Sequence, residues 1–285
     1  SYRCDTAYYK KKEEIEKIIH KYDGIIIRSR FKIDKQLIDK AINLKFIARA
    51  GSGLENINVT YARKKGIKCY SAAEGNKQAV AEHALGMLLS LFNNLTKCNS
   101  EIREGKWLRE QNRGLELSKK TVGIIGYGNN GSAFANLLRG FDVKILAYDK
   151  YLNKYPHQST MQEIYRQCEI LSLHVPLTPE TTYLINNNFI NKFKKNIYLI
   201  NTARGKCVNT KDLISNLKNG KIRGACLDVF EHEKTSFEEL DKENTANIQY
   251  LIKSKKTILS PHIAGWTVES NIKIAKVLVN KISSL

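Results

Sequence analysis

The stretch Thr121–Gly131, TVGIIGYGNNG, decides the fold of this chain. A short apolar run ends in a glycine-rich turn, and the segment that follows, SAFANLLRGF, has the spacing of a helix. In such a turn the first glycine permits a tight bend, the second lets backbone N–H groups approach a pyrophosphate, and the third lets the helix pack closely on the strand. We therefore predict a dinucleotide-binding unit whose phosphate contacts come from Gly126, Gly128, Asn129, Asn130 and Gly131.

A second strand-like run ends at Asp149, 18 residues beyond Gly131. A carboxylate at this position can accept hydrogen bonds from both hydroxyls of the adenosine ribose. The 2′-phosphate of NADP would instead meet its negative charge. The sequence therefore predicts NAD, in preference to NADP, as the cofactor.

Further strand-like runs recur along the chain with helical patterns between them, which is typical of βαβ units and a parallel sheet. The later set occupies residues 121–126, 143–149, 170–175, 198–202, 225–230 and 257–261. An earlier, shorter set occupies 24–29 and 45–50, with a helix-like stretch at 34–42 between them. A long helical pattern from Val80 to about Glu104 lies between the two sets.

These patterns predict an α/β protein. We expect a Rossmann-type doubly wound parallel sheet and a second, smaller flavodoxin-like α/β domain that binds the substrate. We assign residues 1–95, completed by 266–285, to the substrate-binding domain. Residues 96–265 are assigned to the NAD-binding domain.

The composition indicates a globular chain. Its 285 residues are 42% apolar, enough to build the cores of two domains. No apolar run approaches the roughly 18 residues that a membrane span needs, and the first residues, SYRCDTAYYKKKEE, lack the apolar stretch of a secretory signal. We expect a cytoplasmic protein with no membrane partner.

The net charge of +19 raises the question of nucleic acid as a partner. The charge comes from 35 Lys and 12 Arg scattered along the chain, without a basic cluster interleaved with aromatic residues, so we expect no nucleic-acid partner. The six cysteines have no paired or metal-like spacing, which predicts buried thiols in a reducing compartment and no metal site.

Three later fragments each follow a predicted strand: NTARG at 201–205, LDVFEHE at 227–233 and SPHIAG at 260–265. Together with the glycine-rich turn and with RAGSGLEN at 49–56, they closely resemble the NAD-dependent D-2-hydroxyacid dehydrogenases. The resemblance covers nearly the whole chain from about Asp5. It implies an oxidoreductase that interconverts a 2-hydroxy acid and a 2-oxo acid with NAD.

Such a reaction needs a base for the hydroxyl proton and a cation for the substrate oxygens. His262 can act as the base, and Glu233 can act as the carboxylate partner of this histidine. Arg204 can supply the cation. The family pattern places the glutamate five residues after Asp228, which selects Glu233 over Glu231. The resemblance further implies that Asp228 holds the nicotinamide carboxamide. It also implies cofactor contacts for His174, Val175, Pro176, Thr202, Ala203, Ala264 and Gly265. His83, in the long helical pattern, is interpreted as a packing or capping residue.

The candidate substrate residues belong to the earlier set of strands. Arg28, with Ser29 after it, and Arg49 stand at two strand ends, where guanidinium groups could bind a phosphate, and the loop with Ser52 and Gly53 could offer backbone N–H groups to a carboxylate. Within the family, these segments look most like those of the D-3-phosphoglycerate dehydrogenases. That likeness implies 3-phospho-D-glycerate as the substrate and a place in serine biosynthesis. Two alternatives stay open: another D-2-hydroxyacid dehydrogenase, such as a glyoxylate or hydroxypyruvate reductase or a D-lactate dehydrogenase, and a non-enzymatic NAD-binding corepressor.

Two departures from the family pattern affect the expectations. The strand and helix that normally precede the equivalent of Asp5 are absent from the sequence, so either the chain is trimmed or the domain is reduced, and we expect the small sheet to lose a strand. The chain ends at Leu285 without the regulatory serine-binding domain of some relatives, so we expect no feedback inhibition through that domain. The resemblance also places Trp107, Arg109 and Arg113 in a dimer arm, which implies a homodimer.

Overall fold

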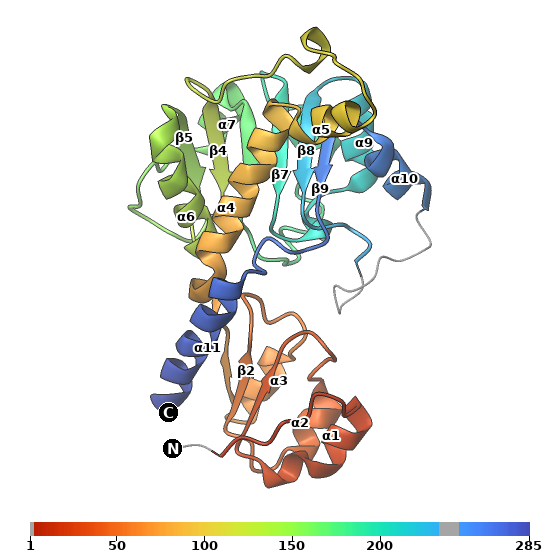
Figure 1. Cartoon of the computed structure of the whole chain (residues 1–285). Coiled ribbons are helices and arrows are strands. Elements are labelled where there is room, and N and C mark those ends of the chain that lie inside the picture. The colour runs from red at the N-terminus through yellow and green to blue at the C-terminus, as the bar shows by residue number, and fades with distance from the viewer. Residues whose placement is uncertain (1–2, 234–244) are drawn as a thin grey trace. The chain divides into compact units, whose positions relative to one another are not determined.

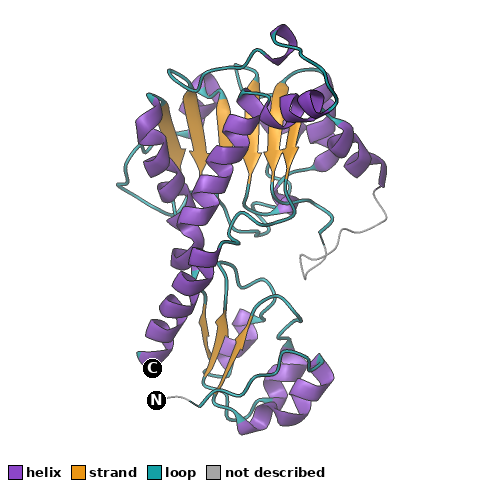
Figure 2. Cartoon of the chain, in the orientation of Figure 1, coloured by secondary structure: helices purple, strands orange, loops and turns teal. Residues whose placement is uncertain are grey.

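The computed structural model of the chain describes residues 3–233 and 245–285 and contains two parallel sheets (Figure 2). The chain divides into two compact units, one formed by residues 1–76 with 271–285 and the other by residues 77–270. The predicted α/β class with two parallel sheets is confirmed.

The small unit is built on a three-stranded sheet with the order β1-β2-β3. Asp34 and Asn58 begin its second and third helices, since their side chains accept hydrogen bonds from Leu37 N and Tyr61 N, both across 3.1 Å. The third strand was not predicted from the sequence, because it is only three residues long. The elements are α1 (Lys12–Ile18), a 3₁₀ turn (Ile19–Lys21), β1 (Gly24–Ile27), α2 (Lys35–Lys40), β2 (Phe46–Arg49), α3 (Val59–Lys64) and β3 (Lys68–Tyr70).

Two cores cover the two faces of this sheet. Ile27 and Ile47 pack with residues of α2 on one face, and Phe46 and Ala48 pack with the C-terminal helix on the other. The alternation follows from the period of two in a strand. It fixes the face from which each side chain leaves the sheet.

The large unit contains a six-stranded sheet, and two of its helices, α4 and α11, begin in one unit and end in the other. Its first elements are α4 (Ala73–Phe92), α5 (Leu95–Arg103), a 3₁₀ turn (Glu110–Asn112), β4 (Thr121–Ile125), α6 (Asn129–Leu137), a 3₁₀ turn (Leu138–Phe141), β5 (Lys144–Tyr148), α7 (Met161–Gln167) and β6 (Ile170–Leu173). They are followed by α8 (Asn187–Ile190), β7 (Ile197–Asn201), a 3₁₀ turn (Gly205–Cys207), α9 (Thr210–Lys218), β8 (Ile222–Leu227), α10 (Thr245–Lys253), β9 (Thr257–Leu259) and α11 (Val268–Ser283). All six strands predicted from the apolar runs are present.

The strand order is β5-β4-β6-β7-β8-β9, and every pair is parallel. The chain moves outward from β4 to β5 and then returns to the other side of β4, so the order reverses there. In open parallel sheets a ligand crevice lies at such a switch point, beyond the carboxyl ends of the strands. Beyond β5, a single parallel bridge joins Ala147 to Gln158, where a dinucleotide fold has its third strand.

Helices cover both faces of the six-stranded sheet. The α4 helix crosses one face (Figure 1), where its residues Ala84 and Leu88 share a core with Val122 and Ile124 of β4 and with α6. On the other face, Leu171 and Leu199 belong to a core with α7, α8, α9 and α10. The sheet is therefore doubly wound.

The long helical pattern predicted for residues 80–104 is two helices. The break falls at Asn93 and Asn94, and Asn94 has φ 52°, a left-handed conformation that asparagine tolerates better than most residues. The first compact unit gives way to the second after Asn76, earlier than the predicted domain boundary after residue 95. The reason is that α4 from Ala81 onward packs on the large sheet.

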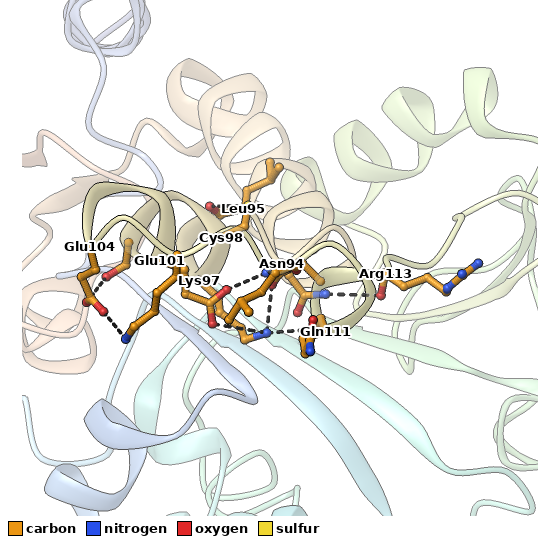
Figure 3. Close-up of polar contacts among 12 residues, drawn as sticks. Asn94, Leu95, Lys97, Cys98, Glu101, Glu104, Gln111 and Arg113 are labelled. Carbon is orange, nitrogen blue, oxygen red and sulfur yellow. Dashed lines mark hydrogen bonds and ion pairs between the residues drawn. The ribbon is translucent and has the colours of Figure 1, made fainter.

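The segment after the break folds back on itself through polar contacts (Figure 3). Lys97 Nζ donates to Gln111 O across 2.9 Å, and Asn112 donates to Glu101 across 2.5 Å. These contacts fix the loop that carries Trp107, a residue that is 78% exposed.

Candidate functional site

The glycine-rich turn after β4 has the geometry of a phosphate cradle. Gly126 has φ 91°, and a Cβ there would lie 2.5 Å from His174 O; a Cβ at Gly131 would lie 2.0 Å from Gly126 O. A Cβ at Gly128 would meet no heavy atom of the described residues within 4 Å, so this glycine borders open space. Gly128 precedes α6 without a side-chain cap, which leaves the first N–H groups of that helix to a ligand. The turn therefore fits a dinucleotide pyrophosphate.

Asp149 lies next to this turn at the carboxyl end of β5. One carboxylate oxygen accepts from Tyr127 N at 2.8 Å, and the other accepts from Tyr151 N and Leu152 N at 2.9 and 3.1 Å. Tyr155 supports the arrangement, since its ring stacks on Tyr127 at 4.9 Å and its hydroxyl accepts from Asp149 N at 2.6 Å. A carboxylate can accept about four hydrogen bonds, so three backbone donors orient the Asp149 carboxylate and leave it able to accept another bond.

The segment His174–Pro176 follows β6 and lies against the same turn. A Cβ on Gly126 would contact Val175 Cγ1 at 3.0 Å as well as His174 O, and Pro176 O accepts from Thr181 Oγ1 at 2.6 Å. Burial lowers the pKa of His174 to about 4, so its imidazole is neutral at pH 7 and hydrogen-bonds to Ser172 Oγ at 2.8 Å. His174 can therefore shape this wall of the site, but it carries no charge there.

Buried Asn201 organises the turn after β7. Its Oδ1 accepts from Ala203 N at 3.1 Å, and its Nδ2 donates to Arg204 O at 3.0 Å. In this turn Thr202 Oγ1 is buried and has no hydrogen-bond partner among the residues that the structure describes, and Asn130 Oδ1 in the glycine-rich turn shares this property. Buried polar atoms are nearly always paired, so both atoms indicate a polar ligand. The sequence did not single out Asn201, although it lies in the fragment that carries Arg204.

The turns after β7 and β8 touch each other. A Cβ on Gly205 would lie 1.8 Å from Phe230 O, so only glycine allows this approach. The contact brings the backbone beside Arg204 onto the segment that ends at Glu233. Arg204 Nη1 donates to Ala203 O across 2.6 Å, which holds the guanidinium over its own turn.

Glu231 and Glu233 have different partners. Glu231 accepts from Thr210 N at 2.8 Å and from the Tyr183 hydroxyl at 2.7 Å, so it caps α9. Glu233 uses one oxygen to accept from Phe230 N and the other to contact His262 Nδ1 at 2.6 Å. Because a carboxylate only accepts, His262 donates this bond. The geometry thus pairs His262 with Glu233 and leaves Glu231 in a structural position.

Asp228 holds the turn that carries His262. Its side chain is 1% exposed and accepts from Ser260 Oγ at 2.6 Å and from Ile263 N and Ala264 N, each at 2.9 Å. Its carbonyl oxygen accepts from His262 N at 2.7 Å. His262 has φ 56°, a conformation that costs a non-glycine residue about 1–2 kcal/mol, so the turn needs these bonds. The predicted contact of Asp228 with a nicotinamide carboxamide stays a prediction, with part of Oδ2 left to make it.

The candidate substrate residues lie in the small unit. Ile27 of β1 and Arg49 of β2 are register partners, so Arg28 and Arg49 leave opposite faces of the sheet. Arg28 lines a cavity of about 210 Å³ with Ile26 and residues of α11. Arg49 is buried and lies over Gly51, where a Cβ would be 2.7 Å from its guanidinium. Ser52, next in this loop before Gly53, donates to Asn76 Oδ1 across 2.8 Å.

Among residues 3–233 and 245–285, no group of three or more His, Cys, Asp and Glu side chains is arranged to hold a metal ion. Over the same ranges, none of the helices has the length and apolar character needed to cross a membrane.

Comparisons with known proteins agree with this geometry. The family model "D-isomer specific 2-hydroxyacid dehydrogenase, NAD binding domain" matches residues 85–264. Hydroxypyruvate reductase of Thermotoga maritima is 35% identical over 97% of this chain and 89% of its own length. D-3-phosphoglycerate dehydrogenase of Methanocaldococcus jannaschii is 34% identical over 96% of this chain and 52% of its own. The chain thus spans about half the length of the curated phosphoglycerate dehydrogenases that it matches.

Among solved structures, the D-lactate dehydrogenase of Aquifex aeolicus, complexed with NAD and lactic acid, superposes with a TM-score of 0.83 at 31% identity. The match covers 94% of this chain and 84% of that one. The phosphate cradle, the carboxylate after β5 and the paired His262 and Glu233 lie within or next to the segment that the family model covers. The chain therefore belongs to the D-isomer-specific 2-hydroxyacid dehydrogenases, a family of NAD-dependent oxidoreductases.

Proposed function

We propose that this protein interconverts 3-phospho-D-glycerate and 3-phosphohydroxypyruvate with NAD(H). The observation that carries the catalytic part is the 2.6 Å contact between His262 Nδ1 and Glu233 Oε2. A carboxylate at this distance fixes the ring and leaves Nε2 as the nitrogen that exchanges the substrate proton. The proposal includes the roles of Arg204, Glu233 and His262.

The cofactor residues follow from the cradle and from the unpaired atoms. The N-terminus of α6 with Gly126, Gly128 and Gly131 would bind the pyrophosphate, and Asp149 would bind the adenosine ribose. The buried oxygens of Thr202 and Asn130 would each gain a hydrogen bond when the dinucleotide is bound. Bound NADH supplies the hydride that reduces the carbonyl carbon of the oxo acid.

The residues of the chain supply the proton and the orientation. As the carbonyl oxygen of the oxo acid becomes a hydroxyl, His262 Nε2 gives it a proton, and Glu233 stabilises the imidazolium beforehand. In the oxidative direction the neutral ring takes the same proton back. Arg204 would bind the carboxylate and the reacting oxygen with its planar fork.

The phosphate of the substrate is assigned to Arg28 and Arg49. Charge-assisted hydrogen bonds from guanidinium groups would favour a phosphorylated acid over a neutral analogue. Since the two side chains leave opposite faces of the small sheet, they could share one phosphate only by curving around its carboxyl edge.

A second candidate is a hydroxypyruvate or glyoxylate reductase. The opposite directions of Arg28 and Arg49 favour it, because a substrate without phosphate does not need both. The similarity to the Thermotoga maritima enzyme over 89% of that enzyme's length also favours it. The two candidates share every catalytic residue and differ only in the substrate.

A spectrophotometric screen separates the candidates. NADH consumption is followed with 3-phosphohydroxypyruvate, hydroxypyruvate, glyoxylate and pyruvate. The proposal expects the highest kcat/KM for 3-phosphohydroxypyruvate. A higher value for hydroxypyruvate or glyoxylate selects the second candidate, and no turnover with any of the four oxo acids would overturn both candidates.

We further propose that the protein is a homodimer formed through the segment 95–113. Leu95, Ile102 and Trp107 are 52%, 51% and 78% exposed, and Ile102 and Trp107 line the same pocket. Exposed apolar side chains that lie together are typical of an interaction surface. Sedimentation equilibrium of the protein and of its Trp107→Ala variant tests this assembly, which would be weakened in the variant.

A further inference from the structure

A chain of three side chains connects α4 to the turn that carries His262. His83 Nε2 lies 2.8 Å from Ser260 Oγ, and Ser260 Oγ lies 2.6 Å from Asp228 Oδ1. All three residues belong to the large unit, although His83 and Ser260 are 177 positions apart in sequence. His83 therefore makes a specific contact instead of only packing or capping.

The two hydrogen bonds between these side chains can have only one direction of donation. The Asp228 carboxylate can only accept, so Ser260 gives its single proton to Asp228. The Ser260 oxygen then accepts from His83, which requires the proton of His83 on Nε2. The imidazole thus fixes the rotamer of Ser260, and Ser260 supplies one of the three bonds that orient the Asp228 side chain.

The hydrogen-bonded series from His83 through Ser260 and Asp228 ends at the backbone on either side of His262. Asp228 accepts from Ile263 N and Ala264 N, and its carbonyl accepts from His262 N. His262 itself is held at φ 56°, so its position depends on the surrounding bonds and not on an intrinsic preference of its backbone. A change in the orientation of Asp228 would therefore move the His262 ring relative to Glu233.

We propose that His83 is a positioning residue for His262, acting through Ser260 and Asp228. This inference rests on the proposed function for the chemical role of His262, but the geometric part does not depend on the substrate. His83 Nε2 is engaged with Ser260 and also lies 3.6 Å from Asp228 Oδ1, so the imidazole reaches Asp228 both through Ser260 and directly. Met87 Sδ, one turn further along α4, lies 3.7 Å from the same Ser260 oxygen and backs it from the apolar side.

The kinetic test compares His83→Ala, His83→Gln, Ser260→Ala and the double variant His83→Ala/Ser260→Ala. With a misplaced acid, kcat of His83→Ala should fall about tenfold, while KM for the oxo acid changes little. Gln can donate from Nε2 and should restore most of kcat. The double variant should lose little more than either single variant, since both break the same chain. Gln78→Ala, on the exposed side of the same helix, is the matched control and should keep wild-type kcat.

A second readout does not need turnover. In protein labelled with ¹⁵N-histidine, the Nδ1–H signal of His262, identified by its loss in His262→Gln, reports the bond to Glu233. We expect His83→Ala to shift or broaden this signal and His83→Gln to restore it. An unchanged signal with wild-type kcat in His83→Ala would overturn the inference, and so would additive losses in the double variant. If the wild type reduces none of the four oxo acids, the proposed function fails, and the His262 signal alone decides the positioning role.

Discussion

Nδ1 of His262 lies 2.6 Å from Oε2 of Glu233, while Oε1 of the same carboxylate accepts from the backbone of Phe230. The carboxylate is thereby fixed on both sides, to the turn after β8 and to the imidazole after β9. The side chain of Glu231, two residues earlier, instead accepts a hydrogen bond from Thr210 N at the start of α9. The different partners of these two glutamates allow their roles to be separated by experiment.

Glu233→Gln should lower kcat, because an amide gives weaker support to the imidazolium than a carboxylate does. A decrease of about 10-fold to 100-fold is expected for a residue that acts through the acid. Glu231→Gln is the matched control and should keep kcat per folded molecule. Steady-state kinetics on both variants measure the difference, and an equal loss of kcat in the two would contradict the assignment.

The stability of the protein should depend on Glu231 at low pH. Burial raises the pKa of Glu231, but hydrogen bonds from Thr210 and Tyr183 outweigh it, so the pKa lies below its ordinary value. A carboxyl with a lowered folded-state pKa contributes stability above its unfolded-state pKa of about 4.3 and loses it as pH falls through the folded-state value. Urea unfolding from pH 7 to pH 3 should therefore show a decrease below about pH 4.5 that is smaller in Glu231→Gln. Identical pH profiles for both proteins would exclude this contribution.

Cofactor choice should depend on Asp149. Asp149→Asn keeps one acceptor oxygen for the neighbouring backbone N–H groups but removes the negative charge. Loss of a charge-assisted bond to the ribose costs about 1.5–3 kcal/mol, so KM for NADH should rise about tenfold or more. KM for NADPH should fall. Equal kcat/KM with NADH and NADPH in the unmodified protein would already refute the role of the carboxylate.

The phosphate assignment predicts selective effects on KM. Arg28→Ala should raise KM for 3-phosphohydroxypyruvate far more than for glyoxylate, with kcat less affected. Arg49 is buried, so Arg49→Lys is the better variant, since it keeps the charge and removes the planar fork. Arg30→Ala, in the same exposed loop, should leave both KM values unchanged. If Arg28→Ala weakens both substrates equally, the arginine binds the common carboxylate or supports the loop.

Much of the large unit could be predicted from the sequence, because its strands are buried apolar runs that end in polar or glycine residues. The pairing of Glu233 with His262 could be anticipated from the spacing to Asp228, which the family pattern supplies. The break between α4 and α5 could not be predicted, because the periodic pattern continues through Asn93 and Asn94 while the backbone of Asn94 is left-handed.

Other features depend on the three-dimensional arrangement alone. That Arg28 and Arg49 leave opposite faces follows from the register of β1 and β2, which no local pattern encodes. The contact of His83 with Ser260 joins positions far apart in the chain. Strand β3 is too short, at three residues, for its alternation to be distinguished from a loop.

We propose that His262, held by Glu233, transfers the proton in the reduction of a 2-oxo acid. The most direct test is the single-turnover rate of NADH oxidation at saturating oxo acid for the wild type, for His262→Ala and for His20→Ala, an exposed histidine that serves as control. We predict a rate about 10² to 10⁴ times lower in His262→Ala and an unchanged rate in His20→Ala. A rate in His262→Ala close to that of the wild type would contradict the claim.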